Sequence, residues 1–138
     1  MSQSQMVEAS NLPVVIIKTG DTNTVTIPFQ IKYGYHIQAD TVNDDNLIAA
    51  ELTFENIDGI DLGKPDYPDY KEFQLKGIDD KLLVFDGLIQ IKVNISASET
   101  VTKGHYSLLG SLYYQACDSV RCLFPRTVNF QLPIEVHN

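Results

Sequence analysis

Apolar and polar residues alternate with a period of two along most of this chain. The clearest runs cover residues 24–32, 85–95 and 128–134, and a shorter run covers residues 51–55. Such alternation predicts β-strands that bury one face and expose the other. Residues 14–17 are apolar at every position, which predicts a central strand or a strand covered by a neighbour.

Turn-forming residues separate these runs, and no stretch of ten or more residues carries a helical face. About seven or eight short strands without intervening helices are typical of an all-β fold. The sequence therefore predicts an immunoglobulin-like antiparallel β-sandwich. Residues 11–138 are expected to form this single domain, after a disordered polar tail at residues 1–10.

Acidic charge narrows the classes of partner. The chain has 10 Lys and Arg against 18 Asp and Glu, a formal net charge of −8 at pH 7. Nucleic acids and anionic membrane surfaces both attract basic proteins, so neither is an expected partner. The N-terminal residues lack the basic and apolar regions of a secretory signal. We therefore expect either a cytosolic protein or a mature domain whose signal is absent from this chain.

The two cysteines are the most informative feature of the sequence. Cys117 and Cys122 have four residues between them, and strand-like runs flank them at residues 106–116 and 127–134. A four-residue loop closes a β-hairpin readily, and opposed Cβ atoms about 4.5–5.5 Å apart lie near disulfide distance. Alternation along the first run predicts that Cys117 points outward. We expect a pair at the hairpin tip that is either a disulfide or a dithiol.

Spacing alone leaves a structural, a redox-active and a metal-binding pair open. A bridge over about six residues removes only about 2 kcal/mol of unfolded-state entropy, against about 4 kcal/mol for one closing ~60 residues between two sheets. Short, accessible bridges are typical of labile or catalytic disulfides. Zinc needs three or four ligands, and no partnered Cys or His spacing is visible. His36 is expected to be solvated or hydrogen-bonded, and His105 and His137 to lie on the surface.

The sequence segments around the two cysteines resemble those of a known protein family. Residues 110–126, GSLYYQACDSVRCLFPR, resemble a signature in which YQ-(A/G)-C is followed, four or five residues on, by C-x-P-P. That signature is typical of the N-terminal periplasmic domain of the thiol:disulfide interchange protein DsbD. Similar segments follow the family order upstream at residues 33–37 (YGYHI), 47–54 (LIAAELTF), 63–68 (GKPDYP) and 83–87 (LVFDG). Phe124 stands where the family usually has the first proline of the pair.

This resemblance implies an immunoglobulin-like sandwich that relays electrons by thiol–disulfide exchange, with no metal or dissociable cofactor. It implies a thiol:disulfide oxidoreductase that is reduced by the thioredoxin-like C-terminal domain of the same membrane protein. The acceptors implied are periplasmic, such as disulfide isomerases and cytochrome c maturation thioredoxins. The implied location is the periplasm.

Carried onto this chain, the resemblance makes Cys117 and Cys122 the redox pair and gives the mixed disulfide to Cys122. The neighbouring Arg121 favours a thiolate at Cys122, whereas Asp118 disfavours one at Cys117. A capping loop in the family corresponds to residues 67–73. In this loop the ring of either Tyr70 or Phe73 would shield the cysteine pair from solvent. The residues expected at the cap or partner-binding surface are Tyr35, Tyr70, Phe73, Arg121 and Phe124.

The competing interpretation is an immunoglobulin-like binding or structural module whose hairpin disulfide is inert. Loss of both cysteines would then reduce stability by only about 2 kcal/mol, with no loss of activity.

Overall fold

A computed structural model of the chain describes residues 5–74, 77 and 81–138. These residues form strands and connecting turns, and no helix among them is long and apolar enough to span a membrane. The strands are β1 (Val7–Ala9), β2 (Val15–Lys18), β3 (Thr22–Ile31), β4 (His36–Gln38), β5 (Glu51–Phe54), β6 (Ile60–Leu62), β7 (Lys71–Gln74), β8 (Lys81–Phe85), β9 (Leu88–Ala97), β10 (Gly104–Tyr114), β11 (Ala116–Cys117) and β12 (Arg126–His137).

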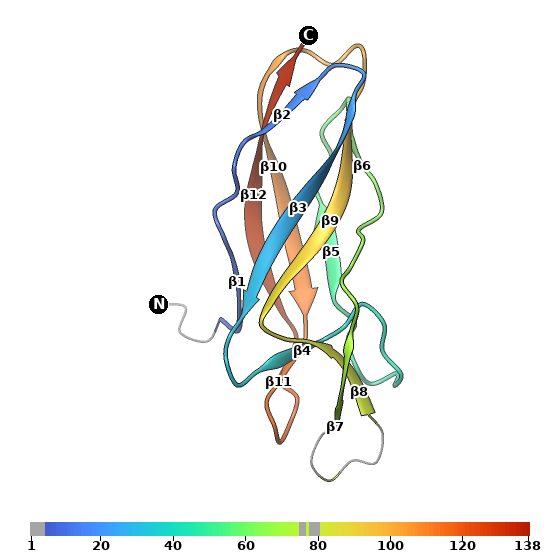
Figure 1. Cartoon of the computed structure of the whole chain (residues 1–138), viewed down its shortest axis with the longest axis vertical. Coiled ribbons are helices and arrows are strands. Elements are labelled where there is room, and N and C mark those ends of the chain that lie inside the picture. The colour runs from blue at the N-terminus through green and yellow to red at the C-terminus, as the bar shows by residue number, and fades with distance from the viewer. Residues whose placement is uncertain (1–4, 75–76, 78–80) are drawn as a thin grey trace.

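The strands form three sheets (Figure 1). The order β1-β3-β9-β6 makes one sheet and β2-β12-β10-β5 makes a second, which faces it. A third sheet, β11-β4-β8-β7, lies at one end of this sandwich. The described strand pairs are antiparallel apart from β2 and β12, which run parallel.

Alternating burial produces the core, as the sequence predicts. Along β9 the inward positions Ile89, Ile91, Val93 and Ile95 are all buried, while their neighbours are exposed or partly exposed. The two large sheets meet at aromatic rings. Phe130 of β12 packs edge-on against Phe29 of β3 with ring centroids 5.5 Å apart.

Two expectations from the sequence are wrong. Residues 7–9 form β1, which pairs with β3, instead of belonging to a disordered tail over residues 1–10. The apolar Met6 and Val7 are buried in the core, and this offsets the polar character of the segment. Residues 1–4 lie outside the described residues. Residues 14–17 are neither central nor covered on both faces. Among the described strands β2 pairs with β12 alone, at a sheet edge, and it buries Ile17 but leaves Ile16 58% exposed.

Gly110 of β10 provides the space that the ring of Phe130 occupies. The two residues are directly opposed in the β10–β12 pair. A Cβ atom on Gly110 would lie only 2.4 Å from the Phe130 ring, and the same ring packs edge-on against Phe54 of β5. The ring is therefore held from two sides and has little room to retreat.

We expect Gly110→Ala to lower the free energy of unfolding by about 1–3 kcal/mol, because overpacking displaces a fixed aromatic ring. Urea denaturation of both proteins measures the change. Ser107→Ala, on an exposed position of the same strand, is the control and should change stability by less than about 0.5 kcal/mol. A Gly110→Ala protein as stable as the wild type would show that the ring is free to move.

Candidate functional site

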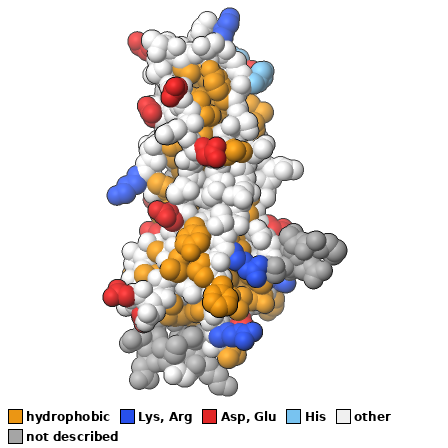
Figure 2. All heavy atoms as spheres, turned by 180° about the vertical axis from the view of Figure 1, so that it is seen from behind, with side chains coloured by type: hydrophobic (Ala, Val, Ile, Leu, Met, Phe, Trp, Pro, Cys, Tyr) orange, Lys and Arg blue, Asp and Glu red, His pale blue; other side chains and the backbone are white. Residues whose placement is uncertain are grey.

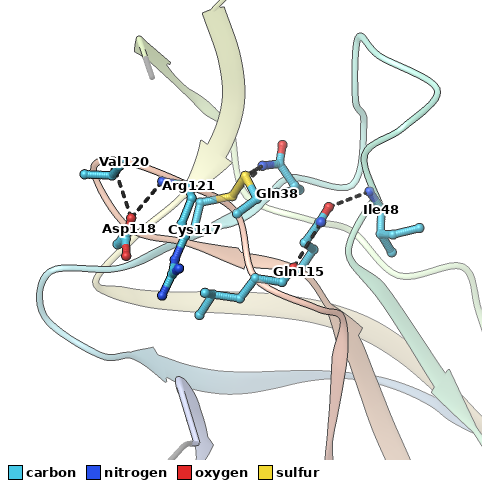
Figure 3. The surroundings of a disulfide bond; sticks show 9 residues. Gln38, Ile48, Gln115, Cys117, Asp118, Val120 and Arg121 are labelled. Carbon is cyan, nitrogen blue, oxygen red and sulfur yellow. Dashed lines mark hydrogen bonds between the residues drawn. A yellow bond between two sulfur atoms is a disulfide. The ribbon is translucent and has the colours of Figure 1, made fainter. Parts of the chain in front are cut away.

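The site is built where the chain passes from the large sheet to the third sheet. Strand β10 ends at Tyr114, and Gln115 separates it from β11, which pairs with β4. The side chain of Gln115 ties this junction together (Figure 3): its Nε2 donates to the Leu123 carbonyl at 3.2 Å, and its Oε1 accepts from the Ile48 N–H at 2.9 Å. The cysteine hairpin is thus anchored to the segment before β5.

Cys117 and Cys122 form a disulfide across a tight hairpin, with Cα atoms 3.9 Å apart. They oppose each other as an antiparallel bridge, so the predicted hairpin is present. The alternation of β10 continues through Gln115, because Leu112, Tyr114 and Ala116 all belong to the main core, and Cys117 points to the opposite side as predicted. The predicted accessibility of Cys117 is wrong, because this residue is completely buried and the buried Gln38 contacts its sulfur. Cys122 is partly exposed.

Asp118 shapes the hairpin loop. Its Oδ1 accepts hydrogen bonds from the backbone N–H groups of Val120 at 2.8 Å and Arg121 at 2.9 Å (Figure 3). The N–H of Asp118 donates to the Arg121 carbonyl at 2.9 Å. The backbone hydrogen bonds, first from Arg121 and then from Val120, hold the pKa of the Asp118 carboxyl below its ordinary value. The carboxylate therefore serves mainly as an acceptor that fixes the loop.

The third sheet has two different faces. Directly opposed residues in a sheet point to the same side, and the pairs that contain the site are Cys117 with His36, Gln38 with Val84, and Phe73 with Leu82. We call the side that carries these six residues the outer face. Cys122 and Leu47 pack on it with Phe73, Leu82 and Val84. The opposite side carries Ile37, Phe85 and Ala116, which belong to the main core.

Gln38 contacts the disulfide from within this face. Its side chain is completely buried. The Nε2 atom donates to Cys117 Sγ at 3.2 Å and lies 3.8 Å from Cys122 Sγ (Figure 3). The Oε1 atom is buried without a hydrogen-bond partner among the described residues.

His36 is also buried at the site, so the expectation of a solvated histidine is wrong. Its ring packs against Phe73 with centroids 4.2 Å apart, and Nε2 has no hydrogen-bond partner in the described part of the chain. Burial lowers the pKa of His36 below its ordinary value, and the nearby Asp86 and Asp118 carboxylates offset this only in part. The ring is therefore neutral at pH 7.

The other predicted site residues differ in their placement. Phe73 packs in the cluster with Cys122, whereas Tyr70 is 49% exposed just before β7. Tyr35 lines a groove of about 570 Å³ together with His36, Phe73 and Ser119. Arg121 is exposed in the hairpin loop, and Phe124 is 90% exposed. Figure 2 shows further hydrophobic side chains at this end of the molecule, interspersed with Lys and Arg.

Sequence reasoning missed Gln38 altogether and misjudged His36. The signal available was their spacing: two residues apart in a strand-like segment, they had to share one face. Which face, and beside which strand, follows only from the pairing of β4 with β11 and β8. The described residues contain no cluster of three or more His, Cys, Asp and Glu side chains that could hold a metal ion.

Comparisons with known proteins bear on the fold and the family. The solved N-terminal domain of DsbD from Neisseria meningitidis, in the reduced form, is 17% identical with a TM-score of 0.52, over 83% of this chain and 79% of that one. The N-terminal periplasmic domain of ScsB from Proteus mirabilis is 13% identical with a TM-score of 0.56, over 94% of this chain but only 44% of that one. No curated protein matches the sequence.

These structures confirm the predicted all-β, immunoglobulin-like fold. The family model described as "Thiol:disulfide interchange protein DsbD, N-terminal" matches residues 3–134, nearly the whole chain. The chain therefore belongs to the family of the DsbD N-terminal domain.

Proposed function

We propose that this domain performs the thiol–disulfide interchange of its family as a relay, in which Cys117 and Cys122 take electrons from a thioredoxin-like donor and pass them to periplasmic proteins. The observation that carries the proposal is the unequal solvent exposure of the two cysteines that form the disulfide. Cys117 is completely buried, whereas Cys122 is partly exposed. An inert disulfide needs no such asymmetry, but an exchange reaction needs one sulfur that a partner can reach.

Reduction of the domain begins at the accessible sulfur. A donor thiolate attacks Cys122 Sγ, a new S–S bond forms, the Cys117–Cys122 bond breaks, and the electron pair stays on Cys117. The donor's second thiolate then attacks the donor sulfur of this mixed disulfide and releases Cys122. The donor ends as a disulfide and the domain as a dithiol.

Delivery of electrons follows the same steps in reverse. The Cys122 thiolate attacks an acceptor disulfide and one acceptor thiolate leaves. Cys117 then attacks Cys122 Sγ, restores the internal disulfide and releases the second acceptor thiolate. Two electrons reach the acceptor, which takes two protons from solvent. Arg121, adjacent to Cys122 and exposed, favours the attacking thiolate by its positive charge.

Phe73 is the proposed cap of the site. Its ring packs on the outer face with Cys122, Leu82 and Val84, so a partner must displace it to reach the sulfur. Tyr70 is not assigned this role, because it is half exposed and does not belong to that cluster. Tyr35 lines the adjoining groove, and the exposed Phe124 offers an apolar contact at the hairpin. We assign both to partner docking.

The reduction potential of the pair decides between a relay and an inert disulfide. Equilibration with glutathione or a thioredoxin-like protein, followed by thiol alkylation and mass measurement, should give a value of roughly −180 to −270 mV, the range of exchange-active pairs. A value well below about −300 mV is typical of structural disulfides and would require withdrawal of the relay.

The attacking cysteine can be identified by single substitutions. The probe is a thioredoxin-like protein whose one remaining active-site cysteine carries thionitrobenzoate, so that attack releases a coloured anion. Cys117→Ala retains the accessible Cys122 and should react roughly tenfold or more faster than Cys122→Ala, which retains only the buried thiol. Equal rates would show that burial does not select the nucleophile.

Truncation of the cap should increase access to the disulfide. Phe73→Ala removes roughly 1 kcal/mol of packing from a partly buried ring, so reduction by dithiothreitol should accelerate by about fivefold. Tyr70→Ala, in the same segment but half exposed, is the matched control and should react like the wild type. An acceleration in Tyr70→Ala alone would move the cap to that ring.

A further inference from the structure

The buried amide of Gln38 is poorly matched to the oxidised site. A disulfide sulfur is a weak acceptor, yet Gln38 directs Nε2 at Cys117 Sγ from 3.2 Å and leaves Oε1 without a partner among the described residues. Burial of an amide is costly unless strong hydrogen bonds offset the loss of water. The geometry therefore suits another state of the sulfur, one that accepts a hydrogen bond strongly.

Reduction creates such a state at Cys117. When a donor attacks the partly exposed Cys122, the bond to Cys117 breaks and Cys117 leaves as a thiolate. This residue is completely buried, and an unpaired anion in a buried position is strongly disfavoured. The reaction thus needs a hydrogen-bond donor already aimed at Cys117 Sγ, because solvent does not reach it.

We propose that Gln38 is a catalytic residue of this site, whose side-chain amide donates a hydrogen bond to the Cys117 thiolate as the disulfide breaks. The inference rests on the proposed function, since it specifies the leaving group of the same exchange. The electron pair of the broken S–S bond stays on Cys117 Sγ, and the new bond joins Cys122 Sγ to the donor. The same amide keeps Cys117 available as a thiolate for the reverse step, when it attacks Cys122.

The titratable and charged groups near Cys117 do not replace the Gln38 amide as the hydrogen-bond donor to its sulfur. His36, its neighbour on β4, lacks the positive charge that would stabilise a thiolate, because burial lowers its pKa, and its Nε2 makes no hydrogen bond to the sulfur among the described residues. The Asp118 carboxylate accepts loop N–H groups, and Asp86 pairs with Lys71 at 2.7 Å. The remaining charged groups on the elements packed nearby are exposed: Arg121 in the hairpin loop, Glu72 on β7 and Lys81 on β8. A neutral amide also stays a donor over the whole working pH range.

The test measures the pKa of the Cys117 thiol and the rate of disulfide reduction in Gln38 variants. In a Cys122→Ala background, Gln38→Met should raise the pKa of Cys117 by about one unit, the size expected for one lost hydrogen bond to an anion. In the background with both cysteines, the same change should slow reduction by dithiothreitol about tenfold. Gln131→Leu, an exposed glutamine on β12, is the control and should change neither quantity.

Gln38→Glu separates hydrogen bonding from packing, because it keeps the shape and replaces the donor with a carboxylate. It should raise the pKa of Cys117 further, and its reduction rate relative to that of the wild type at the same pH should recover as the pH falls and the carboxyl becomes protonated. A purely structural role would lower the stability of both variants without a change in the pKa of Cys117. If the acid dissociation constant of Cys117 and the reduction rate both stay within twofold of wild type in both variants, the inference is overturned.

The outcome is independent of the relay itself. Dithiothreitol reports on the leaving group whether or not a protein partner exists. If the wild type fails to exchange with any thioredoxin-like protein while Gln38→Met still raises the pKa of Cys117, the proposed function is wrong and the role of Gln38 stands. If the wild type exchanges and Gln38→Met behaves identically, only the role of Gln38 is wrong.

Discussion

The site depends on the pairing of β11 with β4. This short ladder sets Cys117 opposite His36 and Ala116 opposite Ile37. Because neighbouring residues of a strand point to opposite sides, the pairing divides the third sheet into a face that joins the core and a face that carries the disulfide. The core face holds the sheet in place, since Ile37, Phe85 and Ala116 are part of the main apolar cluster. The face that carries the disulfide is therefore backed by the main core.

This arrangement places a reactive bond at the border between core and solvent. Cys117 is buried and Cys122 is partly exposed, although only four residues separate them in the sequence. The hydrogen bonds of Asp118 fix the loop between them, so the difference in exposure is built into the hairpin. In the proposed relay a partner meets the sulfur of Cys122, while the sulfur of Cys117 lies 3.2 Å from the Gln38 amide. The Phe73 ring packs on the same face, where it is the proposed cap.

Some of the site was predictable from local signals. Four residues between two cysteines, with strand-like flanks, predicted the hairpin and the proximity of the thiols, because a tight turn brings strand ends together whatever surrounds them. The burial of Cys117 was not predictable in this way. Alternation along β10 placed its side chain on the side away from the main core, but gave no sign that Gln38 from a distant strand covers that side. Gln38 escaped notice for a similar reason, since nothing in its neighbourhood in the sequence marks it as a partner of sulfur.

The sequence by itself determined the longer strands, the all-β fold and the hairpin that joins the two cysteines. These follow from interactions between residues close in the chain: a period of two defines a strand with two faces, and turn residues define its ends. Only the tertiary structure decided which face is buried, which sheet each short strand joins, and which side chains surround the sulfur atoms. Periodicity gives two faces without saying which one meets the core. That choice depends on strands far apart in the chain, such as those of Gln38 and Cys117, which are 79 residues apart.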